Sequence, residues 1–236
     1  MTIEYLKKGI DEKQRTEDHK KIKKVVEETL SEIENKGDNY IRELSKKFDN
    51  YSPLSFKLSE NQIAELMNEV SDDDKEDIKF AQKQVKSFAE AQLKTLNDLE
   101  VETHPGVILG HKNIPIQAVG CYVPAGKFPM VASAHMSVVT ASVAGVPRIV
   151  ATTPPFKGKP NPAVITAMKL GGAHEIYVLG GMQGVGAMAI GTETIKPVDM
   201  LVGPGNAFVA EAKRQLYGKV GIDLFAGPTE TMVIAD

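Results

Sequence analysis

Two side-chain amides and a tyrosine stand where an α/β protein commonly binds its ligand. Gln183 in "GGMQGVGA" and Asn206 in "GPGNAF" each follow an apolar run, lie beside glycines and open an amphipathic segment. Tyr122 in "GCYVPAG" follows another apolar run. An uncharged amide both donates and accepts, which suits a nicotinamide carboxamide or a ribose hydroxyl, and an aromatic ring can stack on a base. The alternatives are structural: Asn206 would cap a helix, Gln183 would bond a loop, and Tyr122 would pack half-buried.

Glycine-rich turns follow several of the apolar runs. A glycine-rich turn between a strand and a helix lets backbone N–H groups and the helix dipole face an anion. The dinucleotide fingerprint G-x-G-x-x-G is incomplete, because "GGMQGVGA" and "GPGNAF" each supply only part of it. Two interpretations fit this pattern. The turns bind a nucleotide or another phosphate-bearing ligand, or their glycines serve only the tight geometry of the turns.

Other residues that could be catalytic or could bind a metal have a simpler, structural interpretation. Cys121 could be a nucleophile, but no base lies nearby in the sequence, and a small core residue is favoured. No two of the five histidines are spaced at i,i+3 or i,i+4, so the sequence predicts no metal site within this chain. The acidic run 72–74 is typical of the first turn of a helix.

The elements that position these residues change character near residue 100. Most charged residues lie before that point, whereas all but two of the 20 glycines lie after it. The first part has helical spacing: apolar residues from Ile22 to Ile33, a short second helix from Ile41 to Phe48, and a capping box at Ser59 and Gln62. Ser71 is expected to cap a long helix whose apolar stripe is Ile78, Ala81, Val85, Phe88, Ala89 and Leu96.

The second part alternates between strands and helices. A hairpin is predicted around Pro105–Gly106, and after Tyr122 apolar runs alternate with helical segments, one of them capped by Asn161 with Pro162 at its first position. This alternation predicts an α/β fold: a Rossmann-like parallel sheet with helices on both faces, preceded by a helix-rich part of a second, incomplete α/β domain. In such sheets ligands bind at the carboxyl ends of the strands.

Composition narrows the function classes. The formal net charge of −3 gives no basic face for nucleic acid. No apolar run is long enough to span a membrane, and the N-terminus lacks the apolar core of a signal peptide. The single cysteine cannot form an internal disulfide, which fits a cytoplasmic protein whose partner is a small molecule.

Four segments resemble the matching segments of the histidinol dehydrogenase family: "VGCYVPAGKFP", "LGGMQGVGAMAIGTETIKPVD", "VGPGNAFVAEAKRQ" and "IDLFAGPTETMVIAD". The resemblance covers roughly the whole chain and is strongest from about 110 to 236. It implies a homodimeric enzyme that uses zinc and NAD to oxidise a primary alcohol through an aldehyde to a carboxylate, L-histidinol to L-histidine.

The resemblance also assigns residues and domains. Tyr122, Gln183 and Asn206 match NAD-contacting positions, and Thr229 matches a substrate-contacting position. The family's zinc ligands and acid/base pair are expected after Asp236, so the chain is expected to be an N-terminal portion that is inactive alone. The implied organisation is an extension over 1–15, half of a discontinuous first domain over 16–121, a Rossmann-like second domain over 122–228, and a return to the first domain over 229–236.

Some residues depart from the usual pattern of the family. Thr229 stands where the family usually has serine, and "GHKNIPIQAVGCYVPAGK" and "LYGKVGIDLFAGPTE" are closer to the sulfopropanediol 3-dehydrogenase branch. That branch acts on a sulfonated diol. Lys127 and His135, with no carboxylate between them, are consistent with an anionic substrate. A non-catalytic fragment or binding module is the third alternative.

Overall fold

The computed structural model describes residues 11–126, 128–224 and 232. Seven strands are assigned there: β1 (Leu99–His104), β2 (Val107–His111), β3 (Ala118–Tyr122), β4 (Arg148–Thr153), β5 (Glu175–Val178), β6 (Met200–Val202) and β7 (Gly221–Ile222). The helices are α1 (Glu12–Lys36), α2 (Asp38–Asp49), α3 (Glu60–Asn68), α4 (Asp72–Leu93), α5 (Val131–Ala134), the π-helix η1 (His135–Val139), α6 (Thr140–Val143), α7 (Pro162–Gly171), α8 (Gly181–Ile190) and α9 (Ala207–Leu216).

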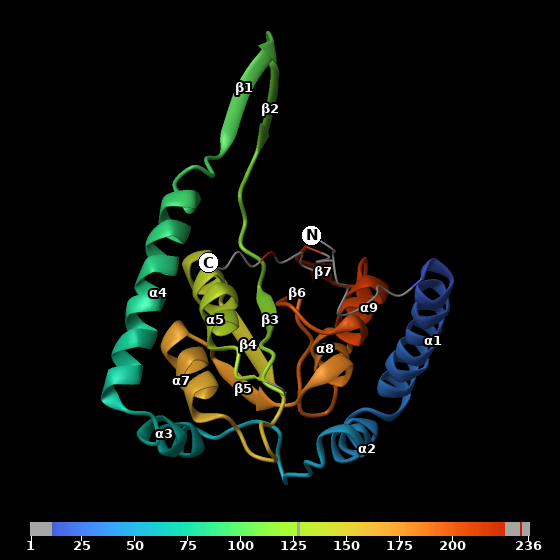
Figure 1. The fold of residues 1–236 in the computed structure, drawn as a ribbon. Coiled ribbons are helices and arrows are strands. Elements are labelled where there is room, and N and C mark those ends of the chain that lie inside the picture. Colours follow the sequence, from blue (N-terminus) through green and yellow to red (C-terminus); the bar gives the residue numbers. More distant parts are fainter. Residues whose placement is uncertain (1–10, 127, 225–231, 233–236) are drawn as a thin grey trace, which may run out of the picture.

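Five strands form one parallel sheet in the order β5-β4-β3-β6-β7. The two faces alternate along each strand: Ala118 and Tyr122 of β3 pack into one core, and Val119 and Cys121 pack into the other. Helices α8 and α9 cover the first face with α1 outside them, whereas α7 and the α5–η1–α6 segment cover the second with α4 outside (Figure 1). The predicted fold class, a parallel sheet with helices on both faces, is confirmed.

Local sequence signals explain several helix boundaries. Ser59 and Gln62 form the predicted capping box of α3, and the side chain of Ser71 caps α4. Asn161 accepts from the backbone N–H of Val164 and Pro162 opens α7, as the sequence predicts. These contacts are short-range, so their residues specify them without help from the rest of the fold.

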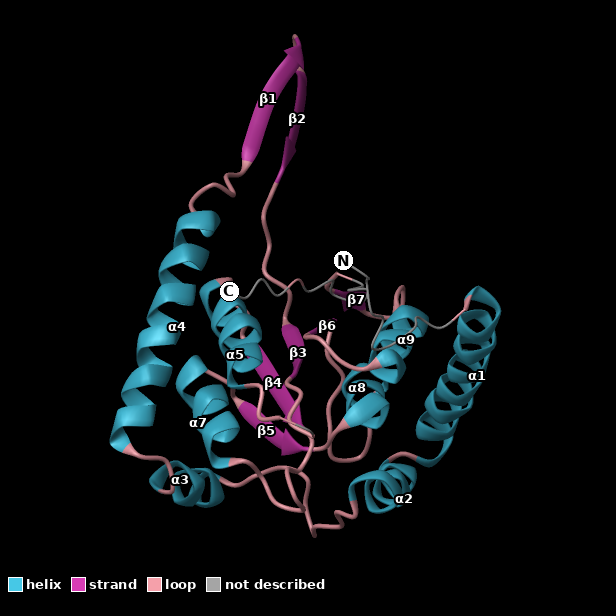
Figure 2. Ribbon diagram, in the orientation of Figure 1, coloured by secondary structure: helices cyan, strands magenta, loops and turns pink. Residues whose placement is uncertain are grey.

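The long helix α4 departs from its predicted packing. Its buried residues are Ile78 and Gln82, whereas Phe88 is 67% exposed and Leu96, just beyond its end, is 59% exposed. Helix α4 lies along α6, η1 and α7, and its last turns continue beyond them towards the β1–β2 hairpin (Figure 2). The predicted apolar stripe is therefore covered only in part, because helical periodicity does not tell how far a partner extends.

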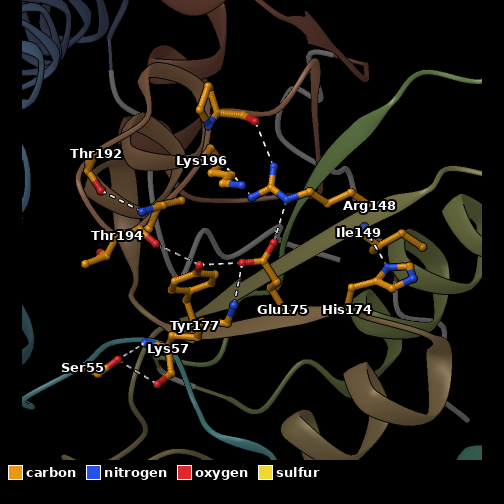
Figure 3. A network of polar contacts seen from close by, with 12 residues as sticks. Ser55, Lys57, Arg148, Ile149, His174, Glu175, Tyr177, Thr192, Thr194 and Lys196 are labelled. Atoms are coloured by element: carbon orange, nitrogen blue, oxygen red, sulfur yellow. Dashed lines mark hydrogen bonds and ion pairs between the residues drawn. The ribbon is translucent and has the colours of Figure 1, made fainter.

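An ion-pair network joins the amino ends of β4 and β5 (Figure 3). Glu175 accepts from Arg148 Nε at 2.7 Å, Lys57 Nζ at 2.9 Å and the Tyr177 hydroxyl at 2.8 Å. The Arg148 guanidinium also donates to the carbonyls of Lys196 and Pro197. Burial alone would raise the pKa of Glu175, but the hydrogen bonds from Lys57, Arg148 and Tyr177 outweigh it and lower the pKa to about 2.

We predict that Glu175→Gln lowers the free energy of unfolding by about 2 kcal/mol at pH 7, a value discounted for solvent screening. Because the pKa is lowered on folding, the stabilisation is full above the ordinary pKa of 4.5 and is lost as the pH falls towards about 2. Urea unfolding at pH 7 and pH 3 should therefore show a smaller pH dependence in the variant. Glu76→Gln, which breaks an exposed pair with Lys79, should change stability by about 0.5 kcal/mol or less. Equal losses in both variants would contradict the prediction.

Candidate functional site

The carboxyl edge of the parallel sheet has a topological switch point between β3 and β6. From β3 the chain runs outward through β4 to β5, and it then crosses to β6 and β7 on the other side of β3. Loops that leave β3 and β6 therefore diverge to opposite sides, and parallel α/β sheets bind ligands at such a point. Tyr122 is the last residue of β3, and the Gly203–Asn206 turn directly follows β6.

Tyr122 links the end of β3 to the first turn of α8. Its hydroxyl accepts a hydrogen bond from the backbone N–H of Gly181 at 3.1 Å, and the residue is 6% exposed. Gly181 has φ +63°, and Gly180 is the N-cap residue of α8 without a side-chain cap. Burial raises the pKa of Tyr122, which keeps the phenol neutral near pH 7. The tyrosine therefore partly replaces the missing cap of α8.

Gln183 lies in the first turn of α8 and is 2% exposed. Its Nε2 donates to Oδ2 of Asp49, the last residue of α2, at 3.3 Å. Burial raises the pKa of Asp49, and the hydrogen bond from Gln183 partly offsets that effect. Sequence reasoning missed Asp49, because it is 134 positions from Gln183 and no local motif connects the two.

Asn206 is the N-cap residue of α9 at the same edge of the sheet. Its Oδ1 accepts from the backbone N–H groups of Phe208 at 3.0 Å and Val209 at 3.1 Å. The structural alternative for Asn206 is therefore present in the fold. Capping uses only the oxygen, so Nδ2 of this exposed residue can still donate to a ligand.

The turn before Asn206 packs directly on the Tyr122 backbone. Gly203 has φ +115°, and a Cβ there would lie 2.1 Å from the carbonyl oxygen of Tyr122. Its backbone N–H donates to Asp223 at 2.7 Å, and its carbonyl accepts from Lys213 Nζ at 2.9 Å. Lys213, which is 5% exposed, also pairs with Asp223. This lysine–aspartate pair, which sequence reasoning missed, fixes both sides of the glycine turn.

The end of β4 brings two hydroxyl groups to the edge. Thr152 and Thr153 are fully buried, and within the described ranges neither Oγ1 has a hydrogen-bond partner. A Cβ added to Gly184 in α8 would lie 3.4 Å from the Thr152 hydroxyl, so that hydroxyl faces the first turn of α8. Buried hydroxyls usually find a partner, so these two are exceptions to the usual pairing at this edge of the sheet.

Four other sequence candidates have different outcomes. Cys121 is fully buried, and burial raises its pKa to about 12, so the thiol is protonated and a core residue, as favoured. His135 is 7% exposed and contacts Gln82 at 3.3 Å, which contradicts its use as an exposed group for an anionic substrate. Lys127 and Thr229 lie outside the described residues.

The described residues contain no group of three or more His, Cys, Asp and Glu side chains that could hold a metal ion.

An apolar groove of about 630 Å³ approaches the switch point from the other face of the sheet, where Val119, Met200 and Val202 line it together with Met136 of η1. Gly203 and Asp223 form its edge. Of the helices that the structure describes, none has the length and hydropathy of a membrane span.

Comparison with known proteins supplies the family context. The sequence profile described as histidinol dehydrogenase matches residues 12–236. The chain is 56% identical over 233 residues to a histidinol dehydrogenase homolog of Shouchella clausii, covering 99% of this chain and 55% of that protein. It is 46% identical over 238 residues to a sulfopropanediol 3-dehydrogenase of Ruegeria pomeroyi, covering 100% and 54%. The crystal structure of histidinol dehydrogenase from Elizabethkingia anophelis matches with a TM-score of 0.82 at 32% identity, covering 95% of this chain and 50% of that one. The chain thus spans about half the length of these relatives.

Proposed function

This chain belongs to the histidinol dehydrogenase family, and from that premise we propose that the carboxyl edge of its sheet binds NAD. One observation carries the proposal: Tyr122 and Gln183 meet at the uncapped first turn of α8, and Tyr122 also contacts the Gly203 turn that precedes Asn206. Three residues from separate segments thereby gather around one switch point, where dinucleotides bind in related sheets.

The residues at this edge fit a dinucleotide. The turns before α8 and α9 are rich in glycine, and the absence of side chains at Gly181 and Gly203 leaves room for the Gln183 amide and for the Tyr122 backbone at this edge. In this proposal the Tyr122 phenol and the amides of Gln183 and Asn206 bind and orient the cofactor, and the sheet edge excludes water from it.

The proposed reaction is the oxidation of a primary alcohol through an aldehyde to a carboxylate, with L-histidinol converted to L-histidine. NAD, when bound, would accept the hydride in each oxidation. Zinc is also implied by the family, but the described residues offer no ligand cluster that fits it. We therefore assign the described residues only cofactor binding, and propose that the metal ligands and proton-transfer groups lie outside them.

A sulfonated diol is the second candidate substrate. Its support is the 46% identity to a sulfopropanediol 3-dehydrogenase and the threonine at position 229, whose methyl group would narrow the pocket. One methyl group changes discrimination by only about 1–3 kcal/mol. Steady-state rates of the active enzyme on both alcohols, with Thr229→Ser alongside, separate the two. A hundredfold preference for histidinol that the variant leaves unchanged would reject the sulfonated diol.

We predict that Gln183→Ala weakens NAD binding to this chain about tenfold, which corresponds to the loss of one good hydrogen bond. Isothermal titration calorimetry measures the dissociation constant directly. Gln92→Ala on the exposed end of α4 is the matched control and should leave it unchanged. An unchanged affinity in Gln183→Ala, with folding intact, would refute the proposed site. NAD binding without turnover in any assembly that contains this chain would instead support a non-catalytic binding module.

The active protein is further proposed to be a cytoplasmic homodimer, and residues 16–121 to be part of a discontinuous first domain. The β1–β2 hairpin supports the proposal of a dimer. Its Leu99, Val101 and Leu109 side chains lie on one face of the ribbon and are 51%, 45% and 56% exposed. An isolated two-stranded ribbon is only marginally stable in water, and an apolar face this large usually has a partner surface.

We predict that Val101→Glu prevents association through this ribbon, because a charge on its apolar face cannot be buried without a partner. Light scattering of the assembled protein measures the mass, and a dimer-to-monomer change is the expected result. Glu100→Lys changes the neighbouring residue on the opposite face and serves as the control. If Val101→Glu remains fully dimeric, the apolar face is buried within one subunit and the hairpin is not the dimer contact.

A further inference from the structure

The carboxylate of Asp49 reaches across the fold to the cofactor-binding amide of Gln183. Asp49 ends α2, and its Oδ2 lies 3.3 Å from Nε2 of Gln183 in the first turn of α8. The residue is partly buried, and Asp49 also contributes to the raised pKa of Tyr122, behind the larger effect of burial. One acidic residue from the N-terminal helices thus contacts Gln183 and acts electrostatically on the Tyr122 phenol.

The position of Asp49 is fixed from both ends of α2. At the start, the backbone N–H of Asp38 donates to Glu193 Oε2 at 2.8 Å. At the end, Asn50 adopts the left-handed conformation with φ 48°, which stops the helix directly after Asp49. Arg42 donates to the carbonyls of Pro53 and Leu54 and holds the following loop. These contacts therefore hold the Asp49 carboxylate in a fixed position.

An ionised carboxylate selects one orientation of the facing amide. A carboxylate can only accept hydrogen bonds, so Gln183 must turn its NH₂ group towards Asp49. Its Oε1 then points towards Gly181, where an added Cβ would lie 2.7 Å from that oxygen. The absence of a side chain at Gly181 makes room for this orientation, and the amide oxygen faces the turn that the cofactor would approach.

We propose that Asp49 is a positioning residue: it fixes the Gln183 amide so that Oε1 stands ready to accept a hydrogen bond from the cofactor. The donor would be a ribose hydroxyl or the carboxamide NH₂ group, and the inference rests on the proposed NAD site. The partial burial of a carboxylate, which opposes ionisation, is consistent with a role beyond stability. Without Asp49 the amide could rotate and present its donor side instead.

The direction in which removal of Asp49 changes the NAD affinity distinguishes positioning from simple electrostatic repulsion. NAD carries a negatively charged diphosphate, so removal of a nearby carboxylate should by itself tighten binding. Positioning predicts the opposite result. We expect Asp49→Ala to weaken NAD binding about tenfold at pH 7, and Asp49→Asn, which keeps the volume, to weaken it less. Asp77→Ala, at an exposed position of α4, removes the same charge and should leave the affinity within twofold.

A double-mutant cycle with Gln183→Ala completes the test, with calorimetry for affinity and the Gln183 side-chain NH₂ resonances of the cofactor-free protein for orientation. Positioning predicts that Asp49→Ala adds no loss in the Gln183→Ala background and shifts those resonances in the single variant. Unchanged or tighter binding in Asp49→Ala, additive losses, or unshifted resonances would overturn it. If Gln183→Ala alone leaves affinity unchanged, the proposed NAD site itself fails, which is a distinguishable result.

Discussion

Gly203→Ala is expected to lower the free energy of unfolding by about 4 kcal/mol, the sum of a conformational and a steric cost. Gly203 adopts φ +115°, a conformation that residues with a side chain rarely adopt. An alanine Cβ would also lie 2.1 Å from the carbonyl oxygen of Tyr122, 3.0 Å from its carbonyl carbon and 3.2 Å from its nitrogen. These are backbone atoms at the end of β3, so relief requires β3 and β6 to separate.

Chemical denaturation measures this loss, and the same variant should lose detectable NAD binding because the turn before Asn206 is displaced. Gly218→Ala is the matched control. Gly218 also has a positive φ, +100°, but apart from its two chain neighbours no atom of the described residues lies within 4 Å of an added Cβ. Only the conformational cost of about 1 kcal/mol should remain there. Equal losses in the two variants would show that the close approach of Gly203 to Tyr122 is not an important constraint.

Lys213→Met is expected to cost about 3 kcal/mol, because it removes one partner of a largely buried charge pair. Methionine retains most of the apolar stem, so the loss reports on the ammonium group. Asp223 and the carbonyl of Gly203 would each lose their contact with Nζ, and the Gly203–Asn206 turn would lose one of its two anchors. Weaker NAD binding should accompany the loss of stability.

The exposed pair of Lys219 and Glu34 provides the control. Lys219→Met should change the free energy of unfolding by about 0.5 kcal/mol or less, because exposed ion pairs contribute little. Thermal or urea unfolding compares the two variants directly. A Lys213→Met protein as stable as Lys219→Met would mean that the Lys213–Asp223 pair is neutral and that other contacts hold the turn.

Much of the fold was predictable from local signals. Alternating strands and helices after Tyr122 indicated the parallel sheet, and caps such as Ser59 and Asn161 marked helix starts because their hydrogen bonds are made within one turn. The exposure of apolar residues towards the end of α4 was not predictable in this way. Its apolar residues have helical spacing, but the layer that covers Ile78 does not reach Phe88.

In the candidate site too, residues with local sequence signals were predictable and residues that depend on distant partners were not. Gln183 and Asn206 could be found because glycines and apolar runs flank them in the sequence. Asp49 and the Lys213–Asp223 pair could not, because each is an ordinary charged residue whose significance depends on a partner in another element. His135 shows the reverse error, since its position near the site suggested ligand contact, whereas its ring packs against Gln82.

The most direct test of the NAD site is a titration of the isotope-labelled chain with NAD, followed by backbone amide resonances. We predict saturable shifts that are largest for Gly181, Met182 and Gln183 at the start of α8 and for Gly205 and Asn206 before α9. The amino ends of β4 and β5, at Arg148 and Glu175, should stay unperturbed. The absence of saturable shifts, or shifts confined to that amino edge, would contradict NAD binding at the carboxyl edge.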